Sequence, residues 1–336
     1  MRTIDDLRSE AAGFGPPAPL DTTYEHAEGI WPDEYRDYER LSRRLAQNFP
    51  HEFDLRYGPD PRHIIDVWMP TDPVEDAPVH VFFHGGSMED GHPRQYGYLA
   101  RPFLEAGAIF VCPSYRLMDP VLAAERRELQ RRSDVFVHEL GADADPVYTR
   151  TRDAGARAAQ VAAVDARAAI AWVHRNISVF GGRPDRLVVS GHSAGAMLAV
   201  TTACSDDWQA EAEVPLDVVS GMMPISGRYG LWQGSAIISQ RDVSNPPHDW
   251  MPLPRIPEAA VVFNEIEWDG EGRDVEERSR DCARIGRTLL DALRAGGGSP
   301  IEVRLPEGTH SDSVRSLGTP GSPTVDAAFT LMGINR

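Results

Sequence analysis

Residues 187–197 read LVVSGHSAGAM, and the rest of the chain is organised around this stretch. An apolar run leads into the pattern Gly-X-Ser-X-Gly, and small residues that can open a helix follow it. The pattern predicts a sharp strand-to-helix turn with Ser193 at its tip, because only glycine and alanine fit around so tight a backbone. The five-residue pattern also occurs by chance, so its context has to decide whether Ser193 is a nucleophile.

The composition is that of an ordinary globular chain of 336 residues, 41% of them hydrophobic and 25% charged. The net charge of −17 opposes binding to phosphate backbones and to anionic membranes. No run approaches the roughly 20 apolar residues of a membrane span, and residues 1–15 are too charged for a secretory signal. We therefore expect a cytoplasmic protein that binds neither nucleic acid nor membrane.

Three widely spaced cysteines, Cys112, Cys204 and Cys282, predict buried free thiols. They form no C-x-x-C pair, so they indicate neither a disulfide framework nor a zinc site.

From Val79 onwards, short apolar runs alternate with helical stretches, which is typical of a parallel sheet covered on both faces. The predicted strands are residues 79–86, 108–117, 187–192, 217–226, 259–267 and 300–307. The predicted helices are residues 96–107, 165–182, 194–204 and 275–297. Two β-rich runs, 52–57 and 63–70, flank a Gly-Pro-Asp-Pro turn and predict an antiparallel hairpin. The fold class is α/β, a mostly parallel, doubly wound sheet.

Three segments stand outside this alternation. Residues 1–50 predict a helical arm that packs on the main domain of residues 51–336. Residues 118–160 are longer than a usual connection and predict a lid or cap insertion. Residues 228–257 carry aromatic side chains among prolines and predict a second cap-like wall, with Trp232 and Trp250 beside the substrate. Surface loops held down by aromatic residues are the alternative for both of these irregular segments.

A serine hydroxyl needs a base within hydrogen-bond reach and a carboxylate that orients the base. The candidate base is His310, which follows the last predicted strand directly; an exposed loop histidine is the alternative. Three acids cluster at the end of the preceding strand, namely Glu265, Glu267 and Asp269.

His84, Gly85 and Gly86 close an apolar strand upstream of Ser193. Backbone amides beside glycine are accessible donors for the oxyanion of a tetrahedral intermediate. We expect the amides of Gly85 and Gly86 to act there with that of Ala194, and the amide of Ser87 is a further candidate. A simple turn is the alternative for this stretch.

Four stretches occur in an order that resembles the α/β-hydrolase superfamily, and within it the hormone-sensitive-lipase-like and kynurenine-formamidase-like carboxylesterases. They are HGG at 84–86, PSYRL at 113–117, residues 165–199 and LPEGTH at 305–310. The resemblance covers roughly residues 60–315 and implies the α/β-hydrolase fold, with serine, acid and histidine in that order.

The resemblance also bears on the acid. Strands of this family place the carboxylate a few residues past the last buried position, which favours Glu267. An acid after an aromatic residue also matches some relatives, so Asp269 stays an alternative. The chain departs from the family pattern at Ser87, where the third glycine of HGGG is expected, and in the unusual 118–160 insertion.

The leading hypothesis is a serine hydrolase that cleaves a carboxylic ester, or a small amide such as an aryl formamide, through an acyl-enzyme. Ser193 would attack, His310 would move the proton and Glu267 would orient the imidazole. This chemistry requires no metal and no organic cofactor. The alternatives are a small-molecule receptor on the same fold and a lyase that uses the same triad. The oligomeric state, a homo-oligomer included, stays open.

Overall fold

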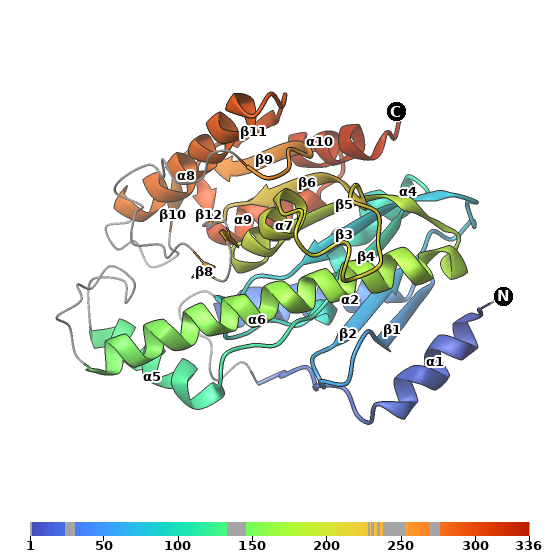
Figure 1. Cartoon of the computed structure of the whole chain (residues 1–336), viewed down its shortest axis with the longest axis horizontal. Coiled ribbons are helices and arrows are strands. Elements are labelled where there is room, and N and C mark those ends of the chain that lie inside the picture. The colour runs from blue at the N-terminus through green and yellow to red at the C-terminus, as the bar shows by residue number, and fades with distance from the viewer. Residues whose placement is uncertain are drawn as a thin grey trace.

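The computed structural model describes residues 2–23, 31–132, 146–227, 229, 232–233, 236–237, 253–268 and 276–335. At its centre is an eight-stranded sheet with the strand order β1-β2-β4-β3-β5-β6-β9-β11 (Figure 1). The strands are β1 (His51–Arg56), β2 (Ile64–Trp68), β3 (Ala77–Phe83), β4 (Ile109–Pro113), β5 (Gly182–His192), β6 (Val219–Ile225), β9 (Glu258–Asn264) and β11 (Ile301–Leu305).

The sheet is mostly parallel, as expected. β1 and β2 form the predicted antiparallel hairpin, and β2 is also antiparallel to β4. Every other neighbouring pair in this sheet runs parallel. The mostly parallel α/β fold predicted from the apolar runs is therefore confirmed.

Alternate residues of the strands build two hydrophobic cores, one on each face of the sheet. In β3, Val79, Val81 and Phe83 join one core, and Phe82 joins the other. The first core is covered by α1 (Ile4–Gly13), α5 (Pro120–Arg132), α6 (Pro146–Asn176), α7 (Ala194–Cys204) and α8 (Glu276–Ala295). Figure 1 shows α6 and α7 crossing in front of the sheet.

The second core is covered by shorter helices. They are α2 (Trp31–Ala46), α3 (Pro93–Tyr96), the 3-10 turn η1 (Gly97–Ala100), α4 (Arg101–Glu105), α9 (His310–Arg315) and α10 (Pro323–Met332). Each face of the sheet thus has its own helical layer, which is the doubly wound arrangement.

The predicted helix at 96–107 is wrong in its continuity, because the structure breaks it into α3, η1 and α4. Gly97 lies so close to Trp68 that an added Cβ would be 2.2 Å from the indole ring. Pro102 occupies the first turn of α4, where a missing amide is tolerated. Close packing and a proline therefore override the helical spacing of the apolar residues.

The predicted helix at 165–182 begins earlier and ends sooner than expected. α6 is one helix of 31 residues that starts at Pro146 and ends at Asn176. A 3-10 turn, η2 (Ile177–Phe180), follows it, and Gly181 then adopts a left-handed φ of 85°. Glycine adopts this conformation without steric cost, and the helix cannot continue through it.

The segment expected to form a lid contains α5 and the first half of α6, with residues 133–145 outside the described part. The expected boundary near residue 160 falls inside the continuous helix α6, where Ala154, Ala158 and Ala162 are buried.

In the second cap-like segment the structure describes β7 (Trp232–Gln233) and β8 (Ala236–Ile237), which pair antiparallel. Trp250 lies outside the described residues. A role of either segment in covering substrate stays a prediction.

The structure also bears on the expected free cysteines and on the expected lack of a membrane-spanning helix. Cys112, Cys204 and Cys282 are all free and buried, as predicted. Among the described residues, no helix has the length and apolar character that crossing a bilayer would need.

Candidate active site

Ser193 lies at the carboxyl end of β5, where α7 begins. Its φ of 54° and ψ of −116° fall outside the regions that a residue with a Cβ ordinarily adopts. The amide of Ser193 donates to the carbonyl oxygen of Ile225 in β6 at 3.0 Å, which ties the strained residue to the sheet. Backbone strain of this kind persists only where the surroundings impose it, and it is typical of functional sites.

The glycines on either side of Ser193 are required by close backbone packing. A Cβ on Gly191 would lie 2.2 Å from the carbonyl oxygen of Gly195, and a Cβ on Gly195 would lie 2.1 Å from that of Phe83. Both obstructing atoms belong to the backbone, so no side-chain rotation relieves the clash. The Gly-X-Ser-X-Gly pattern is thus a steric requirement of this turn.

The loop after β3 lies against the candidate nucleophile. A Cβ added to Gly85 would be 3.3 Å from the Cβ of Ser193. Within the described part of the chain, no residue accepts a hydrogen bond from the backbone amides of Gly85, Gly86 or Ala194. Unpaired amides next to a nucleophile are the donors that a developing oxyanion requires.

Positive φ angles shape this loop. Gly86 has a φ of 111°, and a Cβ there would lie 2.3 Å from the carbonyl oxygen of Asp90. Ser87 and Met88 also have positive φ, 55° and 62°. Ser87 therefore takes a left-handed conformation at the position where the HGGG pattern predicts a third glycine.

His84 holds the loop in place. Its ring stacks on Tyr115 with centroids 4.3 Å apart, and the Tyr115 hydroxyl donates to the carbonyl oxygen of His84 at 2.8 Å. Nδ1 of His84 donates to the carbonyl oxygen of Gly85, also at 2.8 Å. Burial lowers the pKa of His84 to about 3, so the ring is neutral at physiological pH.

A short parallel ladder brings Glu267 beside His310. β10 (Glu267–Trp268) pairs with β12 (Gly308–Thr309), with Glu267 opposite Gly308. The Asn264 side-chain amide donates to the carbonyl oxygen of Thr309 at 2.9 Å and reinforces the register. α9 begins at the next residue, His310, with Thr309 as its cap. The carboxylate and the imidazole meet because these two strand ends run side by side.

Nδ1 of His310 donates to Oε1 of Glu267 at 2.7 Å. Burial alone would raise the pKa of Glu267, but the charge and hydrogen bond of His310 outweigh it and hold that pKa below its ordinary value. Glu267 is therefore ionised at neutral pH. In the neutral form of the His310 ring, a proton on Nδ1 directed at the carboxylate leaves Nε2 as the acceptor. This is the tautomer that a general base needs.

His192 links the candidate nucleophile to the candidate base. Its ring lies 4.3 Å from that of His310 between centroids, and its Nε2 donates to the backbone carbonyl oxygen of His310 at 3.0 Å. Ser193 is the next residue. The structure records no hydrogen bond between the Ser193 hydroxyl and the His310 ring, both of which it describes. Catalytic contacts of this kind are often long until substrate binds.

Sequence reasoning missed three residues around this pair, because each comes from a segment without a motif. Sγ of Cys282 on α8 donates to Oε1 of Glu267 at 3.4 Å. Ser226, at a φ of 41° after β6, contributes to the low pKa of Glu267. The ring of Trp31 meets that of His310 edge-on at 5.9 Å.

Glu267, Cys282 and His310 also offer ligand atoms that all lie within 4.8 Å of one another, a donor set that could hold a metal ion. Oε1 of Glu267, however, already accepts hydrogen bonds from both of the others. The protons on Nδ1 and Sγ suit the arm of a hydrogen-bonded triad, whereas a metal would require both atoms to be unprotonated.

The other acids proposed from the sequence have different surroundings. Glu265 is half exposed and pairs with Arg287 on α8. Asp269 lies outside the described residues, so this alternative stays a prediction.

The site occupies the position that an open α/β sheet offers to ligands. β4 lies on one side of β3 and β5 on the other, so the winding of the chain reverses between β3 and β5. Ligands bind at this reversal, beyond the carboxyl ends of the strands. Gly85 follows β3 and Ser193 follows β5, while Glu267 and His310 come after β9 and β11 on the same edge. The fold is that of the α/β-hydrolases, and the side chains gathered at this edge are of the kinds that a serine hydrolase uses.

Comparisons with known proteins agree with this class. A sequence model of the carboxylesterase family matches residues 155–213, which include the turn at Ser193. Esterase LipC of Mycobacterium tuberculosis is 26% identical over 335 residues, covering 91% of this chain and 71% of that protein. Kynurenine formamidase of Danio rerio is 29% identical over 131 residues, covering 37% of this chain and 41% of that protein. The structure of EstE1, a thermophilic carboxylesterase from a metagenomic library, matches with a TM-score of 0.53 at 18% identity, over 90% of this chain and 97% of that one.

The chain has the α/β-hydrolase fold, and the class of reaction that its relatives support is carboxylic ester hydrolysis, EC 3.1.1. The α/β-hydrolase fold and the esterase class expected from the sequence are confirmed.

Proposed function

We propose that Ser193 is the nucleophile of an ester hydrolase, His310 its general base and Glu267 the carboxylate that orients the base. One observation carries this assignment: His310 donates at 2.7 Å to a buried carboxylate and packs on the residue that precedes the strained serine. All three groups required for covalent catalysis are thereby present at one edge of the sheet.

In the proposed reaction, Oγ of Ser193 attacks the carbonyl carbon of the ester while Nε2 of His310 takes the hydroxyl proton. The ionised Glu267 stabilises the imidazolium that forms. Collapse of the tetrahedral intermediate breaks the bond to the alcohol, which leaves with the proton from His310. Water, deprotonated by the same nitrogen, then attacks the acyl-enzyme, releases the acid and restores Ser193.

We propose the amides of Gly85, Gly86 and Ala194 as the oxyanion hole. Their support is the contact of Gly85 with Ser193 and the absence of an acceptor for these amides among the described residues. Removing a single oxyanion donor costs roughly 10²–10³ in kcat in a well-studied protease, so such donors account for a large part of the rate.

The substrate class follows from the relatives and from the wall of the site. The relative named as an esterase supports carboxylic esters as substrates. The similarity to a kynurenine formamidase supports a small aryl amide as the second candidate. Trp31, whose ring lies 5.9 Å from that of His310 in a T-shaped arrangement, would offer an apolar surface to a medium-sized, partly aromatic substrate. The contribution expected of Trp232 and Trp250 stays a prediction, because their side chains lie outside the described residues.

Labelling with a fluorophosphonate probe tests the nucleophile. We expect the probe to modify Ser193, and Ser193→Ala to lose both labelling and turnover of p-nitrophenyl acetate. Ser220→Ala is the matched control, since that serine only bonds a backbone carbonyl of the neighbouring strand. Undiminished turnover in Ser193→Ala would exclude the mechanism.

A substrate panel separates the remaining choices. It contains p-nitrophenyl esters of increasing acyl length, N-formylkynurenine and an aryl amide. Product analysis for acid plus alcohol or amine distinguishes hydrolysis from a lyase reaction. Binding without turnover of every compound would favour the receptor alternative.

The remaining expectations stay predictions. A lid role for residues 118–160 would show as altered chain-length preference after changes in α5. Cell fractionation checks the cytoplasmic location, and sedimentation checks for a homo-oligomer.

A further inference from the structure

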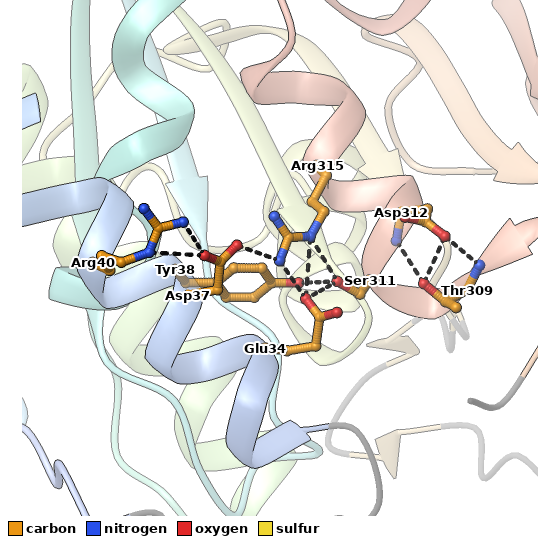
Figure 2. A network of polar contacts seen from close by, with 8 residues as sticks. All are labelled: Glu34, Asp37, Tyr38, Arg40, Thr309, Ser311, Asp312 and Arg315. Carbon is orange, nitrogen blue, oxygen red and sulfur yellow. Dashed lines mark hydrogen bonds and ion pairs between the residues drawn. The ribbon is translucent and has the colours of Figure 1, made fainter. Parts of the chain in front are cut away.

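We propose that helix α2, from the N-terminal arm, positions the general base, and that Glu34 is the positioning residue through which it acts. The inference rests on the proposed triad, because it concerns how His310 is held. Figure 2 shows the network of polar contacts that joins α2 to α9, the helix whose first residue is His310.

α9 depends on outside contacts for its orientation. It has six residues, too few for a helix to be stable by its own hydrogen bonds. Thr309 and Asp312 cap its start reciprocally, which fixes the first turn but not its direction relative to the sheet. Any tilt or rotation of α9 moves the imidazole of His310 away from Ser193.

The first contact is at the residue after the base. Oγ of Ser311 donates to Oε2 of Glu34 at 2.5 Å, and the hydroxyl of Tyr38 lies 2.5 Å from the same Oγ. Because the single Ser311 proton points at Glu34, Tyr38 must be the donor to Ser311. Ser311 and Tyr38 are fully buried, so this short chain of hydrogen bonds is shielded from solvent.

The second contact is one turn further along α9. Arg315 donates to Oε2 of Glu34 from Nε at 3.1 Å and from Nη2 at 2.7 Å, and it also donates to Asp37 at 2.9 Å. Its guanidinium carbon lies 4.8 Å from the ring centroid of Tyr38. Burial would lower the pKa of Arg315, but the hydrogen bonds that it donates to Glu34 and Asp37 outweigh this effect and raise that pKa above its ordinary value.

Glu34 therefore bonds both ends of α9 through one oxygen. The Trp31 ring, one turn earlier on α2, meets the His310 ring itself. Contacts at residues 310, 311 and 315 restrict both rotation and sliding of α9 against α2. A misplacement of about 1 Å in a catalytic group costs on the order of 10²-fold in rate, so such restriction matters for kcat.

The variant Glu34→Ala tests the proposal in the full-length protein. We expect kcat for p-nitrophenyl acetate to fall at least tenfold while KM changes less than twofold, because no substrate contact is removed. Labelling of Ser193 by a fluorophosphonate should slow in parallel. Glu34→Gln, which keeps an oxygen for Ser311 but loses the charge facing Arg315, should restore part of kcat.

Asp33→Ala is the matched control. Its carboxylate lies on the same helix, is almost fully exposed and pairs with Arg36 on the surface. This variant should keep the kcat and labelling rate of the wild type. If Glu34→Ala does not fold, Ser311→Ala and Tyr38→Phe interrupt the same network with little change in volume and should also lower kcat without raising KM.

Two results would overturn the proposal. One is a folded Glu34→Ala or Ser311→Ala variant whose kcat and labelling rate stay within twofold of the wild type. The other is a fall of kcat in Asp33→Ala as large as that in Glu34→Ala. The proposed function fails separately, when the wild type is neither labelled nor active. A labelled, active wild type with an unaffected Glu34→Ala refutes the positioning role alone.

Discussion

The backbone carbonyl oxygen of His310 accepts a hydrogen bond of 3.0 Å from Nε2 of His192. The residue that precedes the proposed nucleophile thus also holds the proposed base. Burial, with a smaller contribution from the facing His310, keeps the pKa of His192 well below its ordinary value. His192 is therefore neutral, with its Nε2 proton fixed on that carbonyl.

Replacing His192 by phenylalanine removes this donor while keeping a ring of similar size. The carbonyl oxygen of His310 keeps the hydrogen bond that Oγ of Ser313 donates to it at 2.8 Å, so we expect a loss of only about 1 kcal/mol in stability. Because the base loses one of its anchors, we expect at least a tenfold lower kcat. Urea unfolding and p-nitrophenyl acetate kinetics measure the two effects. His174→Phe, on the outer helix α6, is the control and should keep wild-type kcat. Equal kcat in His192→Phe and the wild type would show that the contact does not position the base.

Glu267→Gln predicts a pH-dependent loss of stability. The folded pKa of Glu267 lies below its unfolded value, so the ionised carboxylate stabilises the fold above about pH 4.3. This contribution disappears as the pH falls through the lowered folded pKa. The difference in unfolding free energy between wild type and Glu267→Gln should therefore be largest near pH 7 and shrink below about pH 4. Urea titrations across this range measure it, and a difference that grows on acidification contradicts the prediction.

Cys282→Ala removes the second donor to Oε1 of Glu267, 3.4 Å away. A thiol is a weak donor, so we expect only a modest decrease of kcat, about threefold, with unchanged KM. Cys282→Ser keeps a donor and should retain more activity than the alanine variant. Steady-state kinetics of the alanine and serine variants test whether the thiol acts as a donor. If the thiol only fills space, the two variants should be equally active.

Gly195→Ala should prevent the turn from forming. The added Cβ would lie 2.1 Å from the carbonyl oxygen of Phe83, so the strand and helix must separate. We expect a loss of more than about 3 kcal/mol in unfolding free energy or no folded protein at all. Gly13→Ala, with nothing within 4 Å of the new Cβ, is the control and should stay within about 0.5 kcal/mol of wild type. Thermal unfolding monitored by circular dichroism compares them, and similar melting of both variants would contradict the steric explanation.

The parts of the fold that local sequence controls were predictable. The turn at Ser193 follows from glycine spacing, because the clash that forbids larger residues occurs within the turn and its nearest strand. The parallel strands follow from continuous apolar runs, since both faces of the sheet are buried. Helix limits were less predictable, because Gly97 packing on Trp68 and the continuation of α6 to Pro146 depend on neighbours that spacing does not report.

The sequence by itself determined the sharp turn at Ser193, the apolar strands around it and a set of three candidate acids downstream. Only the tertiary structure brings Glu267 to His310, because that pairing depends on the β10–β12 register between segments far apart in the chain. It also decided the surroundings of the base: His192 bonds the backbone of His310, Cys282 bonds Glu267, and the α2 network holds the helix that begins at His310. Local steric rules act within a few residues and can be predicted from the sequence. Contacts across the fold arise only when the sheet and its helices pack together.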